Sequence, residues 1–132
     1  MAHFSIASVT QVTQSPTDNL FDFMGNFNNF KHLLPEDKIE NFECTDEQCS
    51  FGIRGLMPLT IKIKERLPKS RLTFETTGLA KFVFTLHIHL LADQKTNVEL
   101  EGDMNPFIKA MAEKPLRDLV NTMATKLAAL TV

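Results

Sequence analysis

The sequence of 132 residues has no tryptophan and no tyrosine, and it carries eleven phenylalanines instead. A phenylalanine ring has neither a hydroxyl nor an indole N–H, so none of these rings can donate a conventional hydrogen bond. Catalysis by a phenol group is therefore excluded. The chain also lacks an excess of either charge, because 14 basic residues stand against 16 acidic ones. Such a balance offers no electrostatic footprint for a polyanion, and we expect no nucleic-acid partner.

Long hydrophobic runs and export signals are missing as well. The longest nearly apolar stretch, residues 82–92, is interrupted by His and Thr and is too short to cross a bilayer. The first residues show no basic segment followed by an apolar core, so we expect no signal peptide and a cytoplasmic protein. The length suits a single domain, residues 1–132, with one sizeable hydrophobic core.

Cysteine is scarce, since Cys44 and Cys49 are the two in the chain. A zinc site would want more ligands at tighter spacing. If the residues between them form a hairpin turn, the two side chains face each other and can form a disulfide under oxidation. In a chain without an export signal, reduced thiols are the expected state. A catalytic thiol at Cys49 has little support, because no inward histidine accompanies it.

The first third of the chain predicts a strand followed by two short helices. Residues 4–12 alternate between apolar and polar side chains, which is typical of a strand. Ser15-Pro16-Thr17-Asp18 then supplies the residue types that start a helix. Apolar residues follow at helical spacing and are interrupted at Gly25, so two helices in tandem are expected, the second ended by Pro35.

Between residues 38 and 103, turn signals separate six runs, which predicts an antiparallel meander. Cross-strand partners share a face of the sheet, so each hairpin can be checked for consistency. The predicted apolar pairs are Phe42–Phe51, Ile53–Ile61, Ile63–Phe74, Phe74–Phe84 and Ile88–Leu100. The predicted polar pairs on the other face are Lys62–Glu75 and His89–Glu99. Phenylalanines expected on the inward phase of strands are Phe4, Phe42, Phe51, Phe74, Phe82 and Phe84.

The last segment predicts a long amphipathic helix. Asn105 is a good N-cap, Pro106 suits the first helical position, and Pro115 is expected to kink the helix. The expected apolar stripe consists of Phe107, Ile108, Met111, Leu116, Leu119, Val120, Met123, Leu127 and Leu130. The apolar face of the predicted sheet must be buried against another element, and this helix is long enough to cover it.

This order of elements resembles the helix-grip fold of the START-like (SRPBCC) superfamily, which includes polyketide cyclases, lipid-transfer domains and the major birch-pollen allergen family. The segment 15–23 is similar to the family's start of the first helix, and Phe27-Asn28-Asn29-Phe30 followed by Pro35 is similar to its second helix, although Asn26 replaces the usual acid. Residues 104–106 and the closing helix are similar to those of small bacterial members. The resemblance implies an α+β fold. It also implies a seven-stranded curved antiparallel sheet, two short helices after the first strand, and a long C-terminal helix packed across the sheet.

Members of this superfamily bind hydrophobic or amphipathic small molecules, and only some are enzymes. We therefore expect such a ligand, for transport or sequestration, between the sheet and the terminal helix, with no cofactor and no metal. The candidate ligand-binding residues are Phe51, Ile53, Ile61, Ile63, Glu65, Phe74, Thr76, Phe84, Leu86, Leu100, Phe107, Met111, Leu119 and Met123. Methionines such as Met104, Met111 and Met123 suit an adaptable pocket and an ordinary core equally well.

Glu65 and Glu40 fall on the inward phase of their strands, where a carboxylate could orient a polar ligand head or act as an acid or base. A strand-end acid that reaches solvent is favoured for both. Thr10 and Thr76 are the other inward polar candidates. No catalytic residue is assigned, because no inward His, Tyr or Arg accompanies the carboxylates. A cyclase- or dehydrase-like enzyme and a co-chaperone-like interaction module with a tight interior stay as alternatives.

The outer face carries its own polar groups. His87 and His89 share that face with Glu101 and Glu99, and such a set could in principle hold zinc. A solvated row of cross-strand charge pairs is favoured, because nothing in the sequence suggests a layer covering this face. The basic row on the same face, Lys62, Lys64 and Arg66, is too short to indicate nucleic acid.

Overall fold

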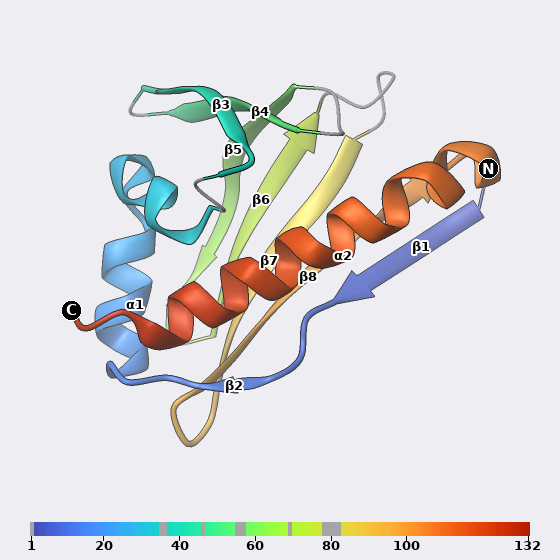
Figure 1. Cartoon of the computed structure of the whole chain (residues 1–132). Helices are drawn as coiled ribbons and strands as arrows, with labels where there is room; N and C mark the ends of the chain where they lie inside the picture. Colours follow the sequence, from blue (N-terminus) through green and yellow to red (C-terminus); the bar gives the residue numbers. More distant parts are fainter. Residues whose placement is uncertain (1, 35–36, 46, 55–57, 69, 78–82) are drawn as a thin grey trace.

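The structure, a computed structural model, describes residues 2–34, 37–45, 47–54, 58–68, 70–77 and 83–132 (Figure 1). Its strands are β1 (Ala2–Ala7), β2 (Gln11–Val12), β3 (Ile39–Cys44), β4 (Gln48–Ile53), β5 (Leu59–Leu67), β6 (Arg71–Thr77), β7 (Val83–Leu91) and β8 (Lys95–Met104). Its helices are α1 (Thr17–Met24), the 3-10 helix η1 (Phe27–Leu33) and α2 (Pro106–Ala129). The predicted α+β order, with two short helices before the meander and a long one at the end, is confirmed.

All described strands pair in one antiparallel sheet in the order β1-β8-β7-β6-β5-β4-β3, and β2 also pairs with β8. Helix α2 runs diagonally across one face of this sheet and packs against β8, β1 and η1 (Figure 1). Phe107 N–H donates to the Asn105 side chain at 2.8 Å, so Asn105 caps α2 as expected. The helix continues through Pro115. None of the described helices combines the length and the apolar character that a membrane span requires.

The predicted first strand is divided in two at Ser8. Ser8 N–H donates to the Val98 carbonyl at 2.8 Å, and Ser8 Oγ accepts from Val98 N–H at 2.9 Å. The Ser8 hydroxyl thereby accepts the hydrogen bond from β8 that a strand carbonyl would otherwise accept. The inward and outward alternation of side chains along the first strand ends at this residue. Beyond this point Thr10 is exposed, so its predicted inward position is wrong.

The hairpin registers are partly as predicted. Ile63 pairs with Phe74 and Lys62 with Glu75, as expected. The rings of Phe42 and Phe51 stack with centroids 6.1 Å apart. The other predicted pairs are wrong, because the observed partners are Phe51–Leu59, Cys49–Ile61, Thr76–Phe84, Phe74–Leu86, Leu86–Leu100, Ile88–Val98 and His89–Asn97. Each of these slips is an even number of residues, so the side chains keep their predicted faces.

Two β-bulges overturn the predicted positions of the inward acids. The register shifts between Ile63 and Glu65, so Glu65 pairs with Thr73 and lies on the outer face. There it accepts a 2.7 Å hydrogen bond from Arg71. A second shift between Glu40 and Glu43 leaves Glu40 exposed, with its carboxylate 4.0 Å from Arg54. A bulge inserts one residue, which reverses the face of everything after it, and neither bulge is visible in the alternation.

The first of these bulges also divides the predicted basic row. Arg66 pairs with Leu72 and donates to the Gly25 carbonyl at 3.1 Å, at the end of α1. Arg66 therefore does not share the outer face with Lys62.

The core lies between the sheet and the helices. The buried residues of α2 are Ala112, Leu116, Leu119, Val120, Met123, Ala124, Leu127 and Ala128. Phe107 and Met111 do not belong to this stripe, because they are 74% and 68% exposed. With about 100° per helical residue, they lie roughly 180° and 140° around the helix from Leu116 at the centre of the buried stripe. Their predicted inward position is wrong.

Cys44 and Cys49 form a cross-strand pair in the β3–β4 hairpin and are joined by a disulfide. The prediction that the two cysteines face each other is confirmed. The expectation that they are reduced thiols is not, because the structure has them in a disulfide. Both sulfurs lie 3.5 Å from the Phe27 carbonyl, so the hairpin packs against η1. The predictions for Pro35 and Phe82, and for the side chains of Ile53, Met104 and Ile108, fall outside the described residues.

Candidate ligand-binding site

The interior between the sheet and α2 is apolar and almost filled. Its remaining void measures about 10 Å³, enough for about one water molecule. The side chains lining it are Phe30, Leu34, Phe51, Leu59, Ile61, Thr76, Phe84, Leu86, Leu100, Leu116, Leu119 and Met123. Of the two possibilities that the sequence left open, a wide cavity or a packed core, the structure shows a packed core around a small void.

Thr76 is the polar side chain among the described residues of this lining. It sits on β6 between Ile61 and Phe84, and it is 3% exposed. Among the described residues its Oγ1 has no hydrogen-bond partner. The equally buried Thr96 differs, since its Oγ1 donates to the His89 carbonyl at 2.7 Å. An unpaired buried hydroxyl is costly and rare in folded proteins, so Thr76 marks a point where a polar partner fits.

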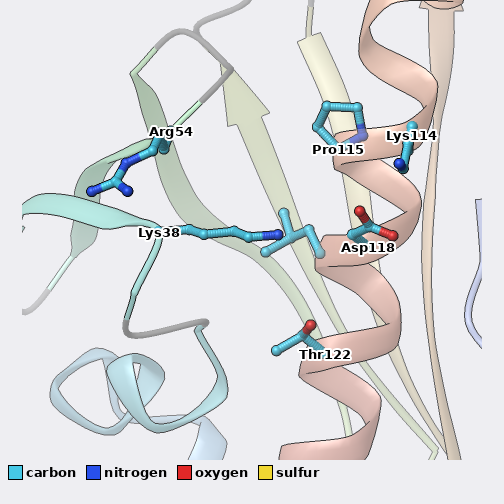
Figure 2. A pocket seen from close by; sticks show the side chains of 7 residues that line it. Lys38, Arg54, Lys114, Pro115, Asp118 and Thr122 are labelled. Carbon is cyan, nitrogen blue, oxygen red and sulfur yellow. The ribbon is translucent and has the colours of Figure 1, made fainter.

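A second, larger cavity opens at the surface beside this interior. It measures about 220 Å³ and is lined by Lys38, Arg54, Lys114, Pro115, Asp118, Leu119 and Thr122. Lys38 precedes β3 and Arg54 follows β4, whereas the other lining residues belong to α2 (Figure 2). The Lys38 side chain extends across this cleft toward the helix (Figure 2).

Leu119 connects the two spaces. Its side chain lines both the surface cleft and the interior void, and it is 6% exposed. A ligand in the cleft therefore touches the same side chain that closes the interior. Leu119 therefore lies at the boundary between the surface cleft and the interior void.

Among the residues that the structure describes, the cleft carries more positive than negative groups. Lys38, Arg54 and Lys114 line it together with the carboxylate of Asp118. Arg54 is engaged by Glu40 at 4.0 Å. Within the described part of the chain, no acidic group lies within ion-pairing distance of Lys38 or Lys114.

The structure brings together most of the predicted ligand-binding residues. Those that line the interior void are Phe51, Ile61, Thr76, Phe84, Leu86, Leu100, Leu119 and Met123. Phe74 is fully buried against Phe27 and Phe30, and Ile63 is half-buried away from the void. Glu65, Phe107 and Met111 lie outside the interior.

Sequence reasoning missed two groups of residues. Phe30, Leu34, Leu59 and Leu116 complete the interior lining. Leu116 already belongs to the predicted apolar stripe and Leu59 continues the alternation, so both could have been added to the candidate ligand-binding residues. Lys38 and Arg54 could not be found in this way, because only the β3–β4 hairpin brings them to α2.

The polar cluster on the outer face is held by hydrogen bonds. Both ring nitrogens of His87 form hydrogen bonds. Nδ1 lies 2.9 Å from the Thr73 hydroxyl, and Nε2 lies 2.8 Å from the Glu101 carboxylate. His89 contacts Glu99 at 3.0 Å, and Ser5 donates to the same carboxylate at 2.9 Å. Both histidines thus meet the predicted acids diagonally rather than directly across. In the described residues, no group of three or more potential ligands has the arrangement of a metal site.

Burial by itself raises the pKa of Glu99. The hydrogen bonds from His89 and Ser5, together with the charges of His89 and His87, outweigh burial, so the pKa of Glu99 is lowered overall. The ionised carboxylate is therefore the form that this cluster stabilises.

A curved antiparallel sheet with two short helices after its first strand and a long terminal helix across one face is the helix-grip fold of START-like proteins. No protein-family model matches the sequence, and no curated protein matches it significantly. Solved structures share its fold. The major latex-like protein 151 of ginseng, Panax ginseng, is 13% identical over 98% of this chain and 99% of that chain, with a TM-score of 0.66.

Bacterial proteins show the same likeness. XoxI from Bacillus cereus is 13% identical over 97% of this chain and 94% of its own, with a TM-score of 0.60. CalU16 from Micromonospora echinospora is 13% identical over 95% and 83%, with a TM-score of 0.53. At these identities the likeness establishes the fold.

Proposed function

We propose that this protein binds an apolar or amphipathic small molecule between the sheet and α2, and so transports or sequesters it. The observation that carries the proposal is the unpaired Thr76 hydroxyl in an otherwise apolar lining. Burial of apolar ligand surface would stabilise the complex by about 25 cal/mol per Å² before ordering costs. A polar atom of the ligand would accept from or donate to Thr76.

The ligand must enlarge the void as it enters. The surface cleft offers a place to bind first, and Leu119 separates it from the interior. Met123 lies one turn further along α2 and is a flexible side chain that can repack around an irregular shape. Binding therefore displaces Leu119 and Met123 rather than filling a preformed chamber.

The proposal is tested by denaturing the purified protein and identifying the released small molecules by mass spectrometry. We expect one apolar or amphipathic compound in stoichiometric amount. The comparison sample is the variant Leu86→Phe, in which a side chain somewhat larger than leucine fills the small void, and we expect it to release much less. Equal amounts from both proteins, or none from either, would overturn the proposal.

A second candidate function is an interaction module, favoured by the nearly filled interior and by the exposure of Phe107 and Met111. Spacing of four and seven residues places Met111 on the same edge of α2 as Pro115 and Asp118, beside the cleft. This reading expects no extracted compound and a stable protein complex that Met111→Ser weakens. The enzyme alternative loses the two carboxylates on which it depended, because Glu65 and Glu40 lie outside the interior.

A further inference from the structure

The surface cleft combines positive charge with direct contact to the apolar interior. Lys38 extends across it, Arg54 lies on the hairpin side, and Leu119 belongs to both spaces (Figure 2). We infer that the cleft recognises the anionic head of an amphiphile, a carboxylate in the simplest case, whose apolar chain passes Leu119 into the interior. This inference rests on the proposed function and names its class of ligand.

Lys38 is the residue best placed for this role. A lysine can lay its four-carbon stem over apolar surface while its ammonium group stays at the water boundary. No acid among the described residues pairs with it. A carboxylate bound to this ammonium group would hold the first carbons of its chain beside the helix edge that contains Leu119.

Arg54 can add a second contact. Its guanidinium is 4.0 Å from Glu40, and both side chains are mostly exposed. Such an exposed pair is held weakly, by about 1 kcal/mol or less. The planar fork of Arg54 is therefore free to turn toward a carboxylate, which it can bind through two parallel hydrogen bonds.

The linings of the two spaces determine which end of the ligand occupies each of them. The cleft of about 220 Å³ accommodates a hydrated head group, whereas the interior void of about 10 Å³ is lined mainly by apolar side chains. A charged group inside would lose its hydration without a partner charge, which is strongly unfavourable. The charged end therefore stays in the cleft, and the chain enters.

The attraction is local. The whole chain has a net charge of −2, so at long range it does not draw anions. The preference for an anionic head group depends on attraction to a few cationic side chains at close range. Salt screens this attraction at exposed sites. We therefore expect the preference for an anionic head to shrink as ionic strength rises, while the contribution of the chain does not.

The test compares three ligands with the same ten-carbon chain, namely decanoate, 1-decanol and decyltrimethylammonium, by isothermal titration calorimetry at neutral pH and low salt. We expect decanoate to bind roughly tenfold more tightly than decanol, and the cationic amphiphile to bind more weakly than decanol. Lys38→Met keeps the length of the side chain and should reduce the advantage of decanoate several-fold. The matched control is Lys95→Met, an exposed lysine at the start of β8, a strand far from β3 in the order of the sheet, and this variant should keep the advantage.

The outcomes separate the inference from the function on which it rests. Equal affinity for decanoate and decanol, or equal behaviour of the two lysine variants, would overturn the anionic head while leaving the apolar site intact. Binding of none of the three ligands would overturn the proposed function and the inference with it.

Discussion

At the scale of single residues, the fold shows how the same side chain takes opposite roles in two positions. Thr76 and Thr96 are both buried on the sheet, yet Thr96 donates a hydrogen bond to a carbonyl and Thr76 has no partner among the described residues. A paired buried hydroxyl stabilises the folded state, whereas an unpaired one costs it free energy.

Replacing each threonine by valine tests this difference. We expect Thr76→Val to raise the free energy of unfolding by about 1 kcal/mol and Thr96→Val to lower it by about the same amount. Valine has nearly the same shape and the same preference for strands, so the hydroxyl is the main change. Chemical denaturation of the two variants and the parent chain measures both effects. Equal destabilisation by both substitutions would show that Thr76 already has a partner.

At the same scale, Glu99 on the outer face predicts how the stability of the folded state depends on pH. The pKa of Glu99 is lowered by its hydrogen bonds and neighbouring histidines, in spite of burial. A lowered folded-state pKa contributes stability above the unfolded value, near 4.5, and this contribution is lost as the pH falls through the folded value. We expect Glu99→Gln to lose less stability than the parent chain between neutral pH and pH of about 3.

Thermal unfolding across this pH range measures the effect, and Glu43→Gln at an exposed position on β3 is the control. The Glu43→Gln variant should keep the acid sensitivity of the parent chain. If Glu99→Gln kept it too, the cluster around Glu99 would contribute nothing to acid stability.

At the scale of elements, alternation and helical spacing predict most of the architecture. The faces of the strands follow from residues two apart, and every slipped register preserves them, as the pairs Phe74–Leu86 and Leu86–Leu100 show. The slips themselves arise because turn length sets the register, and turn signals locate a turn only within a few residues. The bulge before Glu65 could not be predicted, since an inserted residue leaves no mark in the alternation.

Helix α2 shows the same limit. Its capping by Asn105 and its buried stripe from Leu116 onward follow from the sequence. Phe107 and Met111 are apolar and four residues apart, which predicts that they share one face of the helix, yet that face is exposed. Spacing shows that two residues share a face, but only packing shows which face is covered.

Leu119 is the element-scale test of how a ligand enters. We expect Leu119→Ala to lower the free energy of unfolding by roughly 2–5 kcal/mol, as for other buried leucines, and to speed the uptake of a neutral apolar dye several-fold. Leu127→Ala is the control, because Leu127 is fully buried on α2 but lines neither of the two cavities described above. It should cost similar stability without faster uptake. Stopped-flow fluorescence measures the uptake, and equal rates in both variants would place the entrance elsewhere.

At the scale of the whole molecule, the exclusive use of phenylalanine acquires a structural meaning. Phe4, Phe27, Phe30, Phe51, Phe74 and Phe84 are all buried in one core. Phe27 and Phe30 of η1 pack on Phe74 at the centre of the sheet, with ring centroids 6.0 and 5.5 Å apart. Among the described residues that line the void, Thr76 is the polar side chain, and this favours a ligand that is apolar along most of its length.

The most direct test of the central claim is a titration with 1-decanol followed by the ¹³C-methyl resonances of methionine. This ligand has no charge, so the result does not depend on Lys38. Met123 lines the void, Met24 is buried in α1 away from it, and Met111 is exposed on α2. We expect the Met123 resonance to shift in a saturable manner while Met24 stays in place. Shifts confined to Met111, or no shift at all, would contradict ligand binding between the sheet and α2.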